Sequence, residues 1–262
     1  MRLDQLIVER GLTPTREKAR RLILAGEVLV DDMPAEKPGT MIRSDAAMRL
    51  RHPVSPYVGR GGEKLAGVLI DLRIDVKGLR VLDVGASTGG FTDCLLQHGA
   101  SHVTALDVGK GQLDWKLRSD PRVTLIEGVN ARRLEADDFP ERFDLVTIDV
   151  AFISLSKILP AAAPLLREDG RVLALVKPQF ELSREEIDPG GVVRDPDKHF
   201  RAVTRAMEAA QDSGLAVKVL AASRITGLEG NREFFLLMRP GGTTTSDIEV
   251  LHQRARTVCK QE

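Results

Sequence analysis

The chain has 262 residues, and its 38 lysines and arginines are matched by 38 aspartates and glutamates. A hydrophobic share of 42% and a charged share of 29% are typical of a folded globular protein, which excludes a disordered or fibrous chain, and the length suits one large domain with a small one. The balanced charge gives no overall sign of a nucleic-acid partner.

The sequence also argues against a membrane, secreted or metal-binding protein. Its longest apolar runs, such as Val172–Val176, fall far short of the roughly 20 residues that a membrane-spanning helix needs. The first residues contain no apolar core of a secretion signal, so we expect a cytoplasmic protein with no membrane partner. Cys94 and Cys259 are too few and too isolated for a disulfide framework or a zinc site, so we expect no metal.

Residues 1–58 predict a small α+β domain. Apolar residues on one face indicate a helix over 3–10, and a second helix follows from a capping residue at Thr15 to a glycine stop at Gly26. A short strand over 27–30 and a turn at two aspartates come next. This unit is too small for a large hydrophobic core.

Basic side chains gather on the second helix. Residues 1–60 hold 11 basic and 8 acidic residues, and this excess suits a phosphate backbone. The alternative for an isolated run of charges is a solvated helix face. The candidate RNA-binding residues are Arg2, Arg16, Lys18, Arg20, Arg21 and, just beyond this domain, Arg60.

This pattern resembles the S4 RNA-binding domain. The matching residues include Arg2-Leu3-Asp4, Thr15-Arg16-Glu17-Lys18-Ala19 and Lys37-Pro38-Gly39. The family usually turns on Asn-Gly where this chain has Asp31-Asp32, which weakens the turn chemistry and leaves the assignment in place. The resemblance favours RNA binding over the solvated face.

Prolines and glycines at Pro53, Pro56 and Gly59–Gly62 predict a joint, beyond which strands and helices alternate. The expected strands are Arg80–Asp83, His102–Asp107, Val123–Ile126, Asp144–Asp149, Arg171–Lys177, Lys218–Ser223 and Glu233–Met238, and the expected helices are 63–72, 89–98, 111–118, 154–168 and 197–213. The alternation predicts an α/β domain over 59–242, with a mostly parallel seven-stranded sheet and ligands at the carboxyl ends of its strands. Residues 243–262 are expected to form a tail with a helix at about 247–260.

A strand that runs into a glycine-rich turn and a helix indicates a ligand site. The residues concerned are Asp83, Gly85, Ala86, Ser87, Thr88, Gly89 and Gly90. About twenty residues later Asp107 ends the next strand, where a carboxylate can hold ribose hydroxyls. A nicotinamide dinucleotide would want the stricter G-x-G-x-x-G spacing, and Asp83 would repel its phosphates. We therefore favour a cationic ligand with an amino group and a sulfonium.

Four charged residues stand at the ends of predicted elements. Lys64 begins a helix, Asp149 and Lys177 end strands, and Glu233 opens the last strand. Each has an ordinary alternative, such as a surface lysine or a charged residue at a strand end. Gathered beside a sulfonium, two lysines and two carboxylates would form a near-neutral network that can position a hydroxyl group.

Longer motifs resemble those of the TlyA (hemolysin A) branch of the FtsJ-like ribose 2′-O-methyltransferases. They are residues 60–65, 83–92, 107–113, 148–155, 175–181, 190–196 and 230–233. The chain departs from the family at Lys110, where an aromatic residue is common, and at Ala151, where serine is usual. Both positions neighbour the expected site and leave its core intact.

The resemblance implies a Rossmann-like class I methyltransferase that uses S-adenosylmethionine. It implies a catalytic tetrad at Lys64, Asp149, Lys177 and Glu233, and a donor site lined by residues 83–90, Asp107, Asn130 and Ala131. The implied target is a cytidine ribose in ribosomal RNA, free or within ribosomal subunits. One or both ribosomal RNAs could be modified.

The implied reaction is an in-line displacement in which the ribose 2′-hydroxyl attacks the methyl carbon. Lys177 is the candidate to contact the hydroxyl, as its base or as a donor that orients it. A base near neutral pH needs a pKa lowered from about 10.4 to roughly 7–8. The two lysines and two carboxylates would shift this pKa in opposite directions, so we favour the orienting role.

Three rival functions remain to be weighed. A membrane-lytic protein lacks support from any membrane or secretion signal. A ribosome-assembly factor with an inactive catalytic domain would not need the four charged residues. A base methyltransferase would need a nucleophilic cysteine or an Asn/Asp-Pro-Pro-aromatic motif, and neither Cys94 nor Cys259 lies in a suitable turn.

Overall fold

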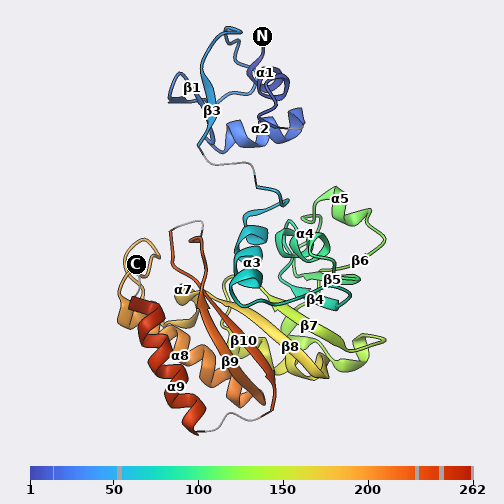
Figure 1. The fold of residues 1–262 in the computed structure, drawn as a ribbon, viewed down its shortest axis with the longest axis vertical. Helices are drawn as coiled ribbons and strands as arrows, with labels where there is room; N and C mark the ends of the chain where they lie inside the picture. Colours follow the sequence, from blue (N-terminus) through green and yellow to red (C-terminus); the bar gives the residue numbers. More distant parts are fainter. Residues whose placement is uncertain (14, 52–54, 228–229, 242–244, 261–262) are drawn as a thin grey trace. The chain divides into compact units, whose positions relative to one another are not determined.

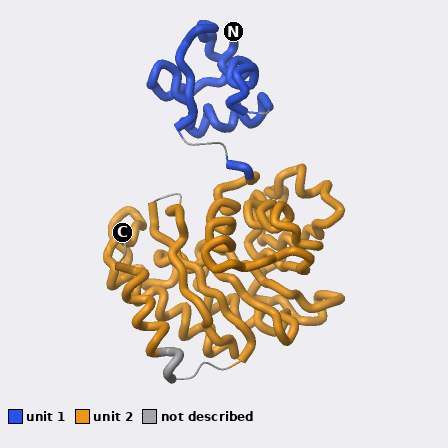
Figure 2. Tube along the Cα trace, in the orientation of Figure 1, with its two compact units in different colours: residues 1–56 blue, residues 57–262 orange. Residues whose placement is uncertain are grey.

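The computed structural model describes residues 1–13, 15–51, 55–227, 230–241 and 245–260. The chain folds into two compact units, residues 1–56 and residues 57–262, drawn blue and orange in Figure 2. Each unit has its own hydrophobic core. Pro53 of the expected joint lies outside the described residues.

The first unit packs two helices against a three-stranded antiparallel sheet (Figure 1). The helices are α1 (Leu3–Glu9) and α2 (Arg16–Leu24), and the strands are β1 (Val28–Val30), β2 (Met33–Pro34) and β3 (Met48–Leu50), in the order β2-β1-β3. As expected, Thr15 caps α2, accepting a hydrogen bond from the Lys18 amide at 3.2 Å. The turn between β1 and β2 has Asp31 and Asp32 at φ +48° and +62°. Aspartate tolerates this left-handed region better than most residues, which explains how the turn closes without Asn-Gly.

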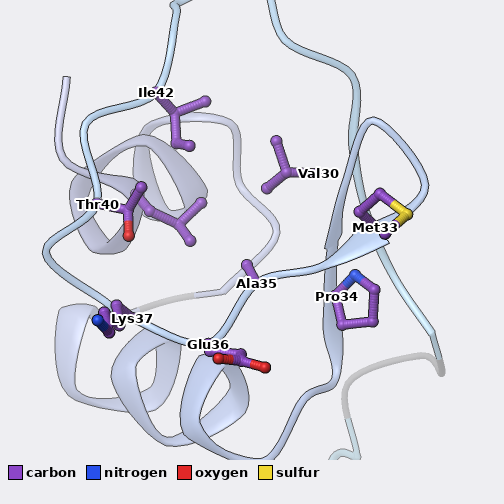
Figure 3. Close-up of a pocket in the computed structure, with 9 residues that line it drawn as sticks. Val30, Met33, Pro34, Ala35, Glu36, Lys37, Thr40 and Ile42 are labelled. Carbon is purple, nitrogen blue, oxygen red and sulfur yellow. The ribbon is translucent and has the colours of Figure 1, made fainter.

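One pocket of about 330 Å³ lies wholly within the first unit (Figure 3). Its lining residues are Leu3, Val30, Met33, Pro34, Ala35, Glu36, Lys37, Thr40 and Ile42. Most of these side chains are apolar, and Glu36 and Lys37 are the charged residues among them. None of the lining residues was singled out as a ligand-binding residue by the sequence.

The second unit is built on a seven-stranded sheet in the order β6-β5-β4-β7-β8-β10-β9 (Figure 1). The strands are β4 (Arg80–Val84), β5 (His102–Asp107), β6 (Val123–Glu127), β7 (Phe143–Ile148), β8 (Leu166–Val176), β9 (Leu215–Ala222) and β10 (Phe234–Pro240). Neighbouring strands from β6 to β8 run parallel, and β10 is antiparallel to both β8 and β9. The expected α/β class with a mostly parallel seven-stranded sheet is confirmed.

Helices cover both faces of this sheet, because its strands carry apolar side chains on each side. One face packs against α3 (Arg60–Asp71), α4 (Gly90–Gln97) and α5 (Trp115–Arg118), through residues such as Leu65 and Leu95. The other packs against α6 (Leu159–Ala162), α8 (Pro196–Asp212) and α9 (Thr245–Lys260), through residues such as Val203 and Leu251. The remaining elements are α7 (Pro178–Glu181) and the 3₁₀ turns η1 (Ala131–Arg133), η2 (Ala136–Asp138), η3 (Leu155–Lys157), η4 (Ala163–Leu165) and η5 (Arg184–Glu186).

Three local predictions were wrong. The expected helix over 154–168 is broken into η3, α6 and η4, and β8 already begins at Leu166. Pro160 and Pro164 explain the break, since a proline removes a backbone donor and clashes with the preceding turn. Of the expected helix over 111–118 only α5 forms. Helix α3 begins at Arg60, so Gly61 and Gly62 belong to the helix and not to a joint.

Candidate active site

The glycine-rich turn after β4 brings three segments of backbone into close approach. Gly85 and Gly89 have φ values of +85° and +96°, a region that favours glycine. A Cβ on Gly85 would lie 2.5 Å from the carbonyl oxygen of Asp149, and one on Gly90 would lie 2.9 Å from the amide nitrogen of Gly62. Any larger residue would push apart the starts of α3 and α4 or the ends of β4 and β7.

Asp107 at the end of β5 faces this turn. Its Oδ2 accepts a hydrogen bond from the Ser87 amide at 2.8 Å, and its Oδ1 accepts one from the Gly109 amide at 2.7 Å. The carboxylate therefore joins the glycine-rich turn to the segment that follows β5. Thr88 is tied to the same segment, because its carbonyl accepts from the Asp114 amide at 3.1 Å.

Asp83 is fully buried and bonded to two threonine hydroxyls. Thr92 on α4 donates to Oδ2 at 2.6 Å and Thr147 on β7 donates to Oδ1 at 3.0 Å. Burial raises the pKa of Asp83 to about 6, against the lowering effect of these hydrogen bonds. This carboxylate joins β4, β7 and α4, and the sequence had given no reason to single out its two threonine partners.

The other predicted donor-site residues follow strands β4 and β6. Ala86 is buried in the core cluster that includes α4, and Ala131 is buried in the cluster on the opposite face. Asn130 caps η1, with its Oδ1 accepting from the Arg132 amide at 3.1 Å. Asn130 and Ala131 follow β6, the strand next to β5, and so lie at the same edge of the sheet as Asp107.

The candidate tetrad comes together as two ion pairs. Its four residues are Lys64, Asp149, Lys177 and Glu233. Lys64 Nζ lies 2.5 Å from Glu233 Oε2, and Lys177 Nζ lies 2.6 Å from Asp149 Oδ1. Their side chains come from α3, the end of β7, the end of β8 and the residue before β10. Because β10 runs antiparallel to β8, the start of β10 meets the end of β8, where Phe234 pairs with Val176.

The tetrad is a buried and electrically balanced cluster. The side chains of Lys64 and Glu233 are 10% and 2% exposed, and those of Lys177 and Asp149 are 13% and 19% exposed. Burial raises the pKa of Glu233, while Lys64 and then Lys177 act to lower it and Asp149 to raise it. The charge of Glu233 thus interacts with those of the other three residues. Asp149 also contacts the last residue of β4, just before the glycine-rich turn, since its amide donates to the Val84 carbonyl at 2.9 Å.

Two phenylalanines beside the tetrad were not predicted as site residues. Phe152, three residues after Asp149, is 91% exposed and holds a φ of +62°, an unusual conformation for a bulky residue. Its ring lies 5.2 Å from that of Phe180, three residues after Lys177. Both belong to long motifs shared with the TlyA branch, which is the signal that could have found them.

The candidate RNA-binding residues of the first unit are mostly engaged with acidic or carbonyl partners. Arg2 and Arg16 both pair with the buried Asp4, at 3.1 and 2.9 Å, and the hydrogen bond from Arg2 is the first reason that the Asp4 pKa falls to about 2. Lys18 donates to the Ser55 carbonyl at 3.2 Å, and Arg21 lies 3.4 Å from Glu17. Arg20 is exposed and pairs with no described residue.

Arg60, in the second unit, begins α3 and is exposed. Its Nη2 donates to the carbonyl of Thr226 at 3.2 Å, so it lies beside the segment that leads to Glu233. Among the residues described by the structure, no helix has the length and apolar character to cross a membrane. Within the same residues, no group of histidines, cysteines and carboxylates has the arrangement of a metal site.

Comparisons with known proteins identify the family. The FtsJ-like methyltransferase family matches residues 57–239, and the S4 domain family matches residues 1–47. The 16S/23S rRNA (cytidine-2′-O)-methyltransferase TlyA of Mycobacterium tuberculosis is 45% identical, over 91% of this chain and 89% of its own length. Hemolysin A of Brachyspira hyodysenteriae is 39% identical, over 89% of this chain and 98% of its own.

A solved structure of a "putative hemolysin" from Streptococcus thermophilus is 40% identical, with a TM-score of 0.75 over 99% of this chain and 97% of that one. The sequence relatives and this structure cover both units of the chain and most of their own lengths. The chain therefore belongs to the FtsJ-like methyltransferases, in the TlyA branch that carries an S4 domain ahead of the catalytic domain.

Proposed function

We propose that this methyltransferase transfers a methyl group from S-adenosylmethionine to the 2′-hydroxyl of a cytidine ribose in ribosomal RNA. The observation that carries the proposal is the buried pair of ion pairs, Lys64–Glu233 and Lys177–Asp149, beside the glycine-rich turn. A ribosomal substrate would place the enzyme in the cytoplasm.

The residues around the turn fit a methyl donor of this kind. Gly85 and Gly89 allow the turn to pack closely, since a Cβ on either would meet Asp149 or Leu117, and Asp107 stands at the end of β5 where ribose hydroxyls can be held. The two tetrad carboxylates balance the two lysines, so the tetrad places no net positive charge beside the sulfonium. When bound, S-adenosylmethionine supplies an electrophilic methyl carbon on that sulfur.

We assign Lys177 the role of orienting the hydroxyl. Its ammonium is held by Asp149 at 2.6 Å, and an N–H that remains free can donate to the 2′-oxygen, leaving a lone pair directed at the methyl carbon. With the donor bound, this oxygen would form a bond to the methyl carbon as the carbon–sulfur bond breaks, the electron pair of that bond would stay on the sulfur, and the hydroxyl proton would pass to water. Orientation of this kind contributes on the order of 7–11 kcal/mol in well-aligned model reactions.

Phe152 is the residue we assign to the RNA base. An apolar ring that is 91% exposed at φ +62° has no folding advantage, whereas aromatic rings bind unstacked bases by stacking. It lies within three residues of Asp149, so a base stacked on it brings its ribose to the tetrad. The S4 domain would add contacts to the phosphate backbone through Arg20 and the basic face of α2.

The variant Lys177→Ala tests the assignment. We expect methylation of ribosomal subunits from cells that lack this gene to fall by at least about 100-fold, as for other groups that act in the transition state. Binding of S-adenosylmethionine, measured by calorimetry, should change little, because in this proposal Lys177 contacts the RNA hydroxyl and not the methyl donor. Transfer at the wild-type rate by this variant would overturn the role of Lys177.

The same preparation separates the rival functions. An assembly factor with an inactive catalytic domain would bind RNA without binding S-adenosylmethionine, so a donor titration of the wild-type protein distinguishes it. A lytic protein would release haemoglobin from red cells equally well with wild-type protein and with Lys177→Ala. The proposed enzyme should bind S-adenosylmethionine and should not lyse red cells.

A further inference from the structure

Two loops carry the halves of the Lys177–Asp149 ion pair. One follows β7 and runs from Asp149 to η3, and the other follows β8 and continues into α7. Because β7 and β8 are parallel neighbours, both loops leave the same edge of the sheet. Their separation sets the distance between the lysine and its carboxylate partner.

Glu181, at the end of α7, bonds directly to the other loop. Its Oε2 accepts from the Ser154 hydroxyl at 2.6 Å, and its Oε1 accepts from the Leu155 amide at 2.9 Å. The side chain is buried, and no step of the proposed reaction uses it. The carboxylate thus closes a second bridge across the two loops, alongside the ion pair at the tetrad.

A buried carboxylate such as that of Glu181 carries a larger desolvation penalty than a neutral side chain. Burying its charge is unfavourable, and an amide or hydroxyl could cap η3 with a smaller desolvation penalty. Its hydrogen bonds are shorter and stronger than neutral ones, which restricts the loops more tightly. The loop that it holds also contains Phe152 at φ +62°, a conformation that persists only when the surroundings fix it.

We propose that Glu181 is a positioning residue, which fixes the Asp149–Phe152 loop against the Lys177 loop so that Lys177 meets the 2′-hydroxyl in a reactive orientation. This inference rests on the proposed function. A residue that only stabilised the fold would have no selective effect on turnover.

The test compares Glu181→Ala and Glu181→Gln with the wild type. We expect Glu181→Ala to lower kcat on ribosomal subunits by at least about tenfold, since small misplacements of reacting groups are costly. The KM for the subunits and the Kd for S-adenosylmethionine should change less than about threefold. Glu181→Gln retains an acceptor and the side-chain shape, and should recover most of the rate.

Glu208→Ala, a substitution at an exposed position on α8, serves as the control.

Hydrogen exchange of the two loops provides a readout apart from activity. Glu181→Ala should speed exchange in residues 149–155 and 177–182 and leave the sheet unchanged. If Glu181→Ala fails to fold, Ser154→Ala removes one hydrogen bond from the opposite loop and should lower kcat by about threefold or more. A wild-type kcat in the folded variants, or a loss explained wholly by donor affinity, overturns the proposal. A wild-type enzyme that does not methylate would refute the proposed function instead, and exchange would still show whether Glu181 joins the loops.

Discussion

At the scale of single residues, the buried carboxylate of Asp83 links β4 to α4 and β7. That Asp83 attracts a cationic ligand remains a prediction. Its two oxygens are occupied by the hydroxyls of Thr92 and Thr147, which lie on other elements. The sequence shows a carboxylate at a strand end but not the hydroxyls that fold against it, so the structural role of Asp83 could not be predicted.

Asp83 should make folding stability depend on pH. Because its pKa in the folded state is about 6, above the ordinary 3.8, the folded protein binds more protons than the unfolded chain between these values. The free energy of unfolding should therefore fall as pH rises from about 4 to 6, by on the order of 3 kcal/mol from this residue.

Asp83→Asn should lack this dependence. Denaturant unfolding at intervals from pH 4 to 7 would show the gap between variant and wild type moving in favour of the variant as pH rises. Parallel curves across this range would mean that Asp83 does not titrate there.

At the scale of elements, periodicity predicted the strands better than the helices. All seven strands of the large sheet formed near their expected positions, because each is a short apolar run between polar turns. The segment over 154–168 has a helical pattern of apolar residues but two prolines, and only the structure shows where the chain passes from turns into β8. The antiparallel entry of β10 likewise depends on pairing between distant segments.

Close packing of the turn after β4 against the end of β7 predicts a sharp effect of Gly85→Ala. The new Cβ would meet the Asp149 carbonyl at 2.5 Å, in addition to the strain of an alanine at φ +85°. We expect a clear loss of donor affinity, measured by calorimetry, and of methylation rate.

Gly78→Ala is the matched control, since Gly78 has φ +77° but nothing within 4 Å of the added carbon. It should lose about 1–2 kcal/mol of stability from backbone strain and keep its activity when folded. Equal losses of activity in both variants would show that strain alone, and not contact with Asp149, is responsible.

At the scale of the whole molecule, the sequence predicted the gathering of the tetrad only through family resemblance. Spacing places Lys64, Asp149, Lys177 and Glu233 at element ends, but no pattern states which ends meet. In the structure these residues meet as two ion pairs, while their catalytic roles stay predictions. The sequence indicated the basic residues of α2. It did not indicate that Asp4 would form ion pairs with Arg2 and Arg16, two of the candidate RNA-binding residues.

Removing residues 1–56 should separate binding of the two substrates. The second unit has its own cores on both sheet faces and contains the whole tetrad, so residues 57–262 should fold and bind S-adenosylmethionine like the full chain. The KM for ribosomal subunits should rise about tenfold or more, because the proposed contacts of α2 with phosphates would be lost. An unchanged KM would indicate that the S4 domain does not engage this substrate.

The antiparallel strand β10 has a consequence for biosynthesis. Lys64 leaves the ribosome early, but its partner Glu233 is added only when nearly the whole catalytic domain has been translated. A nascent chain that stops short of Glu233 therefore cannot form the Lys64–Glu233 ion pair, and Lys64 has no carboxylate partner in the tetrad until β10 is made.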